Sequence, residues 1–295
     1  MKTPLFTGSS VAICTPFTDS GINFPKLAEL IDFQIANGTA AITICGTTGE
    51  CSTQTLEEHI ETVDFCVRHV AGRIKVLAGA GSNDTQAALL LSKEAQRSGA
   101  DGLLIATPYY NKATQRGLVR HYFHIADQVD IPIILYNVPH RTGLCFSADT
   151  YKELSKHPLI NGVKEASGDF TLLARTMSLC GDDLYIYSGN DDQTVPMMSL
   201  GAKGVISVMA NILPREMADL CEAALTGDFK RAAELQLQYI NLIDALFTEV
   251  SPIPVKTALN LMGMEAGPLR LPLCDMDPKN LETLKAAMTA SGIKL

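Results

Sequence analysis

A lysine ends an apolar run near the middle of the chain. Residues 159–164 read LINGVK, so the run closes on Lys164. An ammonium ion is costly to bury unless it is paired, so Lys164 is either a solvated residue at a strand tip or an amine that chemistry needs there. A neutral amine attacks a ketone to give a Schiff base, and burial favours the neutral form of an amine. Carbonyl chemistry is therefore a hypothesis that depends on where this run lies in the fold.

Eight short apolar runs recur along the chain, and amphipathic stretches separate them. Most of the runs are continuous rather than alternating, which is typical of strands that are covered on both faces. Eight strand–helix units without a linker between two halves favour a (β/α)8 TIM barrel, with a doubly wound sheet as the alternative. The predicted strands are residues 10–14, 40–45, 74–78, 102–106, 131–136, 159–164, 184–187 and 204–208.

The last part of the chain, residues 214–295, contains no clear strand. Its apolar spacing predicts helices over residues 215–225, 229–250, 255–262 and 278–290. We therefore expect residues 1–213 to form a barrel catalytic domain and residues 214–295 to form a C-terminal helical appendage.

Polar groups follow the predicted strands, and a barrel of this kind has its active site at the carboxyl ends of its strands. The segments there contain many hydroxyls, one lysine and one arginine. They read GTTGE (46–50), TPYYN (107–111), YNVPHRTG (136–143), KEASGD (164–169) and SGND (188–191). This location favours the interpretation of Lys164 as an active-site amine.

Four other residues in these segments suit the same chemistry. The Tyr136 hydroxyl could pass protons during Schiff-base formation, and Thr47 and Thr48 could hydrogen-bond a carboxylate or orient a tyrosine. The Arg141 guanidinium could bind a carboxylate through two hydrogen bonds. Each residue also has a plainer explanation: a core tyrosine with its tip in water, capping hydroxyls in a turn, or an arginine in a surface loop.

Other side chains are weaker candidates. Three further lysines compete poorly with the one at 164, since two lie at strand starts and one in the helical tail: Lys75, Lys203 and Lys256. His121 and His124 lack a third ligand, so we expect surface residues rather than a metal site. The acidic pair at 191–192 is expected to begin a helix rather than to bind a metal.

Composition excludes several classes of protein. A net charge of −8 argues against non-specific nucleic-acid binding, which needs a basic face. No stretch approaches the roughly 18 apolar residues of a membrane span, and the first residues lack the long apolar segment of a secretory signal. The eight cysteines include no CxxC pair. We therefore expect reduced, mostly buried thiols in a cytoplasmic protein rather than disulfides.

Five motifs at the predicted strand ends resemble one enzyme family. The order GTTGE, TPYYN, YNVPxRTG, IxGVKEASGD and SGND is similar to that of the dihydrodipicolinate synthases, and the likeness runs from residue 6 to residue 272. The wider group of class I pyruvate aldolases shares the lysine, the tyrosine and a GxxGE loop. The double threonine and the arginine after YNVP favour the synthase branch.

The resemblance implies a role for each matching position. Lys164 would condense with pyruvate. Thr47, Tyr136 and Tyr110 would form a proton relay, with Tyr110 reaching in from a partner subunit. The resulting enamine would attack the aldehyde of aspartate semialdehyde and give 4-hydroxy-tetrahydrodipicolinate, in lysine and diaminopimelate biosynthesis.

The same resemblance implies how the substrates are held. Thr48 would help to hold the pyruvate carboxylate, and Arg141 would hold the carboxylate of aspartate semialdehyde. Backbone groups of Gly189 and Ile206 would line the pocket. The family needs no metal or organic cofactor, and its members are dimers or dimers of dimers.

Two other functions remain open, and one regulatory property is expected to be absent. A related aldolase acting on a sugar acid would use the same lysine and tyrosine, and a non-catalytic barrel could keep the pocket for binding. Family members that lysine inhibits use a histidine and a glutamate where this chain has Leu56 and Ala87. We therefore expect weak or no inhibition by lysine.

Overall fold

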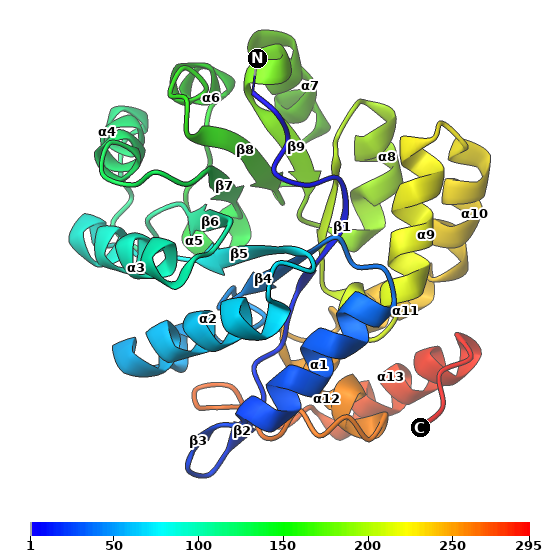
Figure 1. The fold of residues 1–295 in the computed structure, drawn as a ribbon. Helices are drawn as coiled ribbons and strands as arrows, with labels where there is room; N and C mark the ends of the chain where they lie inside the picture. The colour runs from blue at the N-terminus through cyan, green and yellow to red at the C-terminus, as the bar shows by residue number, and fades with distance from the viewer. Residues whose placement is uncertain (1) are drawn as a thin grey trace.

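The computed structural model describes residues 2–295, and its centre is a closed barrel of eight parallel strands (Figure 1). Going around the barrel the order is β1-β10-β9-β8-β7-β6-β5-β4, and β4 pairs with β1 to close it. This confirms the predicted (β/α)8 architecture. The strands are β1 (Gly8–Ala12), β4 (Ala41–Ile44), β5 (Lys75–Gly79), β6 (Gly102–Ala106), β7 (Ile133–Asn137), β8 (Ile160–Glu165), β9 (Tyr185–Ser188) and β10 (Gly204–Ser207).

Helices surround the barrel, and polar caps fix where most of them begin. At the start of α2, the Thr55 hydroxyl accepts from the Glu58 backbone N–H and the Glu58 carboxylate accepts from the Thr55 N–H, which is a capping box. Asp84, Thr114 and Ser147 cap later helices through their side chains. The surrounding helices are α1 (Phe24–Ala36), α2 (Leu56–Val70), α3 (Thr85–Ser98), α4 (Gln115–Ala126), α6 (Ala148–Leu154), α7 (Phe170–Cys180), α8 (Thr194–Ser199) and α9 (Pro214–Leu225).

Buried apolar side chains form two clusters, one inside the barrel and one between the strands and the helices. The inner cluster includes Leu77, Leu104 and Ile206. Within this cluster Phe6, from the segment before β1, stacks on Tyr187 with ring centroids 4.3 Å apart, and the Tyr187 hydroxyl donates to the Phe6 carbonyl. The segment before β1 therefore fills the lower end of the barrel.

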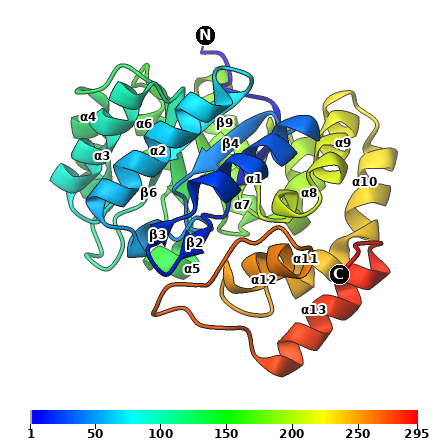
Figure 2. The same cartoon turned by 60° about the horizontal axis from the view of Figure 1, so that its bottom comes forward.

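The C-terminal helices lie at the other end. Figure 2 shows α11 (Ile240–Ala245), α12 (Ile253–Leu261) and α13 (Pro278–Ala290) grouped on the side where α5 (Pro139–Thr142) follows β7. These helices therefore border the carboxyl ends of the strands. The first helix after residue 213, α9, instead packs against β1. The division of the chain at residue 213 stays a prediction.

Two parts of the secondary structure differ from the sequence-based expectation. The predicted helix over 229–250 is wrong: α10 (Phe229–Gln238) ends at Tyr239, whose backbone leaves the helical conformation, and α11 begins after it. Buried Leu235 and Leu242 continue the apolar spacing across the break, so periodicity does not reveal it. The short hairpin of β2 (Phe17–Thr18) and β3 (Gly21–Ile22) was not predicted.

Between residues 2 and 295, no helix combines the length and the apolar character that crossing a bilayer requires.

Candidate active site

Lys164 and Tyr136 are register partners on the neighbouring strands β8 and β7. Lys164 is only 5% exposed and Tyr136 only 8% exposed, so both side chains are withdrawn from bulk water. The Lys164 Nζ atom lies 4.5 Å from the centroid of the Tyr136 ring. The apolar run that ends on Lys164 therefore delivers a buried amine to the face of a phenol, a position that also suits a cation.

A cavity of about 490 Å³ opens beside this pair. Thr47, Tyr136, Arg141 and Lys164 all line it, and so do small or apolar residues of several strands and loops: Ala12, Thr43, Leu104, Ala106 and Val138. Four of the predicted site residues are thus brought together from three separate strand ends. A cavity of this size accommodates small metabolites with a few precisely placed polar groups.

The two threonines lie in a tight turn between β4 and the short helix η1 (Cys51–Thr53). Within the turn, the Glu50 N–H donates to the Thr47 carbonyl. Cys45 and Glu50 flank the turn with φ angles of 53° and 52°, a left-handed conformation that side chains rarely adopt unless their surroundings hold it. Thr47 faces the cavity, whereas Thr48 is buried beside it.

Arg141 lies on α5, directly after the strand that carries Tyr136. Its Nη2 atom donates to the carbonyl oxygen of Ser251 in the C-terminal region, at 3.0 Å. A guanidinium carries five N–H donors, so this contact orients the side chain at the cavity wall and leaves further donors for a carboxylate.

The remaining predicted residues occupy different environments. Tyr110 is 88% exposed with a φ angle of 71°, and its neighbour Tyr109, not Tyr110, is among the described residues that line the cavity. Ile206 is buried in the inner cluster together with Tyr136. Gly189 donates its N–H to the Glu165 carbonyl, and an added Cβ would lie 2.6 Å from the Ala166 Cβ. The catalytic and binding roles of all eight predicted residues stay predictions.

A buried carboxylate behind the site was missed by the sequence reasoning. Glu165 accepts from the Asn137 side-chain amide at 3.0 Å and from the Tyr151 hydroxyl at 2.8 Å. These contacts join the ends of β7 and β8 on the side facing away from the barrel interior, so they fix the backbone that presents Lys164. A charged residue next to Lys164 in a buried strand was the available signal.

Asp191 is a second buried carboxylate, and the sequence predicted its position at the start of a helix but not its hydrogen-bond partners. It lies in η3 (Asp191–Gln193), as the expectation of a helix start implied, but it does not cap that helix. Its Oδ2 atom accepts from the N–H groups of Val208 and Met209 instead. Burial raises the pKa of Asp191, while these hydrogen bonds and the charge of Lys164 oppose the rise.

The eight cysteines are all free within the described residues. Five of them are buried, as expected, and Cys274 is exposed. Burial raises the pKa of the Cys14 thiol to about 12, so that sulfur is unreactive at neutral pH.

Fold and cavity together define a class: a (β/α)8 barrel of the class I aldolase type, with a buried lysine and a tyrosine on adjacent strands at the mouth. The chain belongs to the dihydrodipicolinate synthetase family, whose model matches residues 5–291. It is 56% identical over 291 residues to a 4-hydroxy-tetrahydrodipicolinate synthase of Thermoanaerobacter sp. (strain X514), a match that covers 98% of each chain.

Solved structures give the same answer. The dihydrodipicolinate synthase of Aquifex aeolicus superimposes with a TM-score of 0.97 at 45% identity, covering 98% of this chain and 99% of that one. A chloride-inhibited dihydrodipicolinate synthase of Acinetobacter baumannii, complexed with pyruvate, superimposes with a TM-score of 0.95 at 42% identity, covering 97% and 99%.

Proposed function

We propose that this chain condenses pyruvate with L-aspartate 4-semialdehyde to form 4-hydroxy-tetrahydrodipicolinate. The observation that carries the proposal is the buried Lys164 amine beside Tyr136, in a cavity that Thr47 and Arg141 also line. The curated relative at 56% identity carries the name of this synthase. The pyruvate in the Acinetobacter baumannii structure supports the first substrate.

The reaction begins with the amine. Lys164 Nζ attacks the ketone carbon of pyruvate, a carbinolamine forms, and loss of water leaves an imine. The protonated imine then accepts the electron pair that remains when the pyruvate methyl group loses a proton, which gives an enamine. Tyr136 and Thr47 pass protons to and from the departing water and the reacting carbons.

The second half forms the carbon–carbon bond. The enamine carbon attacks the aldehyde carbon of the second substrate, and the aldehyde oxygen takes up a proton. The amino group of that substrate then attacks the imine carbon, closes the ring and expels the Lys164 amine. The enzyme returns to its starting state, and the atoms of the two substrates leave as one ring and one water.

The two substrate carboxylates are held by different residues. Thr48 helps to hold the pyruvate carboxylate, and backbone groups of Gly189 and Ile206 line the pocket. Arg141 serves the carboxylate of the semialdehyde, and the Ser251 carbonyl fixes its orientation. Holding both carboxylates aligns the enamine carbon with the aldehyde, and such positioning supplies a large part of a rate enhancement.

Assembly is part of the proposal. Tyr110 is almost fully exposed in a left-handed backbone conformation, which suits a side chain that enters the cavity of a partner subunit. A homodimer would then be the smallest competent unit. It would act either alone or as half of a tetramer. The free thiols support a reducing compartment, and we assign the protein to the cytoplasm.

Borohydride reduction in the presence of pyruvate tests the function. We expect the intact protein to gain the mass of one reduced pyruvate adduct per chain, located on Lys164 by peptide mapping. The Lys164→Ala variant should gain none. Turnover of aspartate semialdehyde in a coupled assay then identifies the second substrate, whereas turnover of a sugar acid alone would assign the chain to the related aldolases, and no adduct at all would leave a binding barrel.

A further inference from the structure

We propose that Glu50 is a positioning residue for this reaction, because its carboxylate ties the turn that carries Thr47 and Thr48 to the C-terminal helices. The C-terminal segment would then hold one wall of the active site in place. This inference rests on the proposed function and deepens it, since it concerns the same cavity.

Both carboxylate oxygens of Glu50 are used in this attachment. Oε1 accepts from Lys256 Nζ at 2.6 Å, and Oε2 accepts from the Arg270 backbone N–H at 3.0 Å. The two partners lie on and after α12, more than 200 residues along the chain from Glu50. One side chain therefore fastens the turn to two points of the C-terminal segment.

The ion pair is fully enclosed. Each of the two side chains, Glu50 and Lys256, is only 1% exposed, and Lys256 Nζ lies 4.1 Å from the centroid of the Phe17 ring. A buried pair of this kind contributes little net stability because both charges must be desolvated, but removing one partner alone is costly. The position of this ion pair is better explained by the turn conformation that it fixes.

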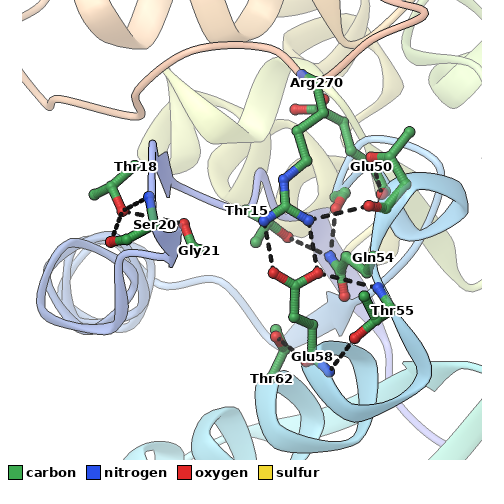
Figure 3. A network of polar contacts seen from close by, with 12 residues as sticks. Thr15, Thr18, Ser20, Gly21, Glu50, Gln54, Thr55, Glu58, Thr62 and Arg270 are labelled. Carbon is green, nitrogen blue, oxygen red and sulfur yellow. Dashed lines mark hydrogen bonds and ion pairs between the residues drawn. The ribbon is translucent and has the colours of Figure 1, made fainter.

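A second ion pair extends the attachment to α2. Figure 3 shows the Arg270 guanidinium directed at the Glu58 carboxylate, and the two bonds between them are both 2.6 Å long. Arg270 also donates to the Thr53 carbonyl at 3.0 Å. The Arg270 backbone thus holds Glu50 while its side chain holds the residues just beyond the turn.

The turn needs such support. Glu50 itself and Cys45 are in the left-handed region, where the backbone is strained for any residue with a Cβ. Gln54, also drawn in Figure 3, donates from Nε2 to the Gly49 carbonyl at 2.9 Å and steadies the turn from outside. Without the carboxylate of Glu50, the turn would relax and Thr47 would move relative to Lys164.

Two measurements on four variants test this. The variants are Glu50→Gln, Lys256→Met, the double variant, and Tyr122→Phe, which removes a buried hydrogen bond between α4 and β6 as a control. The first measurement is hydrogen exchange of the peptide covering residues 45–54. The second is the rate at which pyruvate forms the reducible adduct on Lys164.

Glu50→Gln replaces one carboxylate oxygen with an NH2 group, so one of the two donors, Lys256 Nζ or the Arg270 N–H, would face another donor instead of an acceptor. We expect at least about tenfold faster exchange of the 45–54 peptide and at least about tenfold slower adduct formation in Glu50→Gln. The double variant should regain thermal stability relative to Glu50→Gln, because no unpaired ammonium remains buried. Its exchange and adduct rates should nevertheless stay at the Glu50→Gln level.

The control should lose stability and keep the wild-type exchange and adduct rates. Wild-type rates in Glu50→Gln, or their return in the double variant, would overturn the positioning role and leave only a stability effect. If Glu50→Gln does not fold, Lys256→Met and the double variant carry the same comparison. An absence of adduct in the wild-type protein would reject the proposed function, while exchange at 45–54 would still report on the attachment.

Discussion

The Lys164 amine and the Tyr136 ring are register partners on adjacent strands, with Nζ 4.5 Å from the ring centroid. The backbone of β7 and β8 therefore sets their separation, and no loop has to close to bring them together. In the proposed reaction, a proton carrier in this position would serve the lysine during Schiff-base formation and release.

Removing the Tyr136 hydroxyl separates its chemical role from its packing role. Tyr136→Phe keeps the ring against Lys164, so we expect a thermal stability within about 1 kcal/mol of wild type and an adduct rate lower by about 10²–10⁴-fold. Rapid quenching with borohydride measures the rate, and Tyr122→Phe is the matched control for loss of a buried phenol hydroxyl. An unchanged adduct rate would remove Tyr136 from the relay.

Mixed subunits test the crossing of Tyr110. Tyr110→Phe and Lys164→Ala should each be inactive or nearly so as pure proteins. If Tyr110 acts in the partner's cavity, a one-to-one mixture after subunit exchange should recover about a quarter of wild-type activity, because half the dimers then carry one complete site. A mixture as inactive as its components would place the hydroxyl in its own chain's cavity, and an active Tyr110→Phe protein would place it outside the reaction.

Arg141 should determine binding of the second substrate only. Arg141→Lys keeps the charge and loses the planar pair of donors, so we expect KM for aspartate semialdehyde to rise about 10- to 100-fold. The pyruvate adduct should form at the wild-type rate. Slower adduct formation in this variant would show that Arg141 acts on the first half of the reaction as well.

L-Lysine should be a weak inhibitor or none. The chain has Leu56, which is 43% exposed, and Ala87 at the two positions where the inhibited relatives are expected to have polar partners for the ligand. We expect less than half inhibition at millimolar lysine in the coupled assay. The variant carrying both Leu56→His and Ala87→Glu should become more sensitive, and strong inhibition of the wild type would contradict this expectation.

His121 should make the protein less stable in mild acid. The sequence indicates a surface histidine, but the side chain is 6% exposed and its Nδ1 atom pairs with the Thr85 hydroxyl at 3.0 Å. Burial, assisted by the nearby His124 and opposed by Asp84, lowers the pKa of His121 to about 4. Between the ordinary value of 6.5 and that value the unfolded chain binds a proton that the folded chain does not.

As the pH is lowered from 6.5 toward 4, the free energy of unfolding should consequently fall by roughly 1.4 kcal/mol for each pH unit, in addition to the contribution of other groups. Urea unfolding at pH 7, 6 and 5 measures the slope. His121→Phe removes the titration, and its stability should depend less steeply on pH. Parallel curves for the two proteins would show that His121 does not titrate in this way.

Much of the fold follows from local pattern. The predicted run at 102–106 coincides with β6, and the other seven runs lie within two residues of a barrel strand, because strands covered on both faces are apolar throughout. The helix at 278–290 also coincides with α13. The two-residue strands β2 and β3 are too short to produce a recognisable pattern.

The candidate site also has a part that local pattern predicts and a part that it does not. Lys164, Tyr136, Thr47 and Arg141 meet at one cavity because strand ends in a barrel share one rim, which local pattern is enough to predict. The pairing of Glu50 with Lys256 joins two distant parts of the chain, and no local feature marks it. The sequence placed Lys256 in the helical tail as a poor competitor of Lys164, and it did not reveal that this side chain is among the most deeply buried.

The packing at the lower end of the barrel limits the route by which substrates and product can move. Phe6 and Tyr187 fill it, and the Lys2 ammonium group binds three carbonyl oxygens beneath them, those of Ser155, Ile160 and Asp183. The barrel is therefore closed at this end. In the proposed reaction both substrates would therefore enter, and the ring that they form would leave, through the opening at the carboxyl ends of the strands.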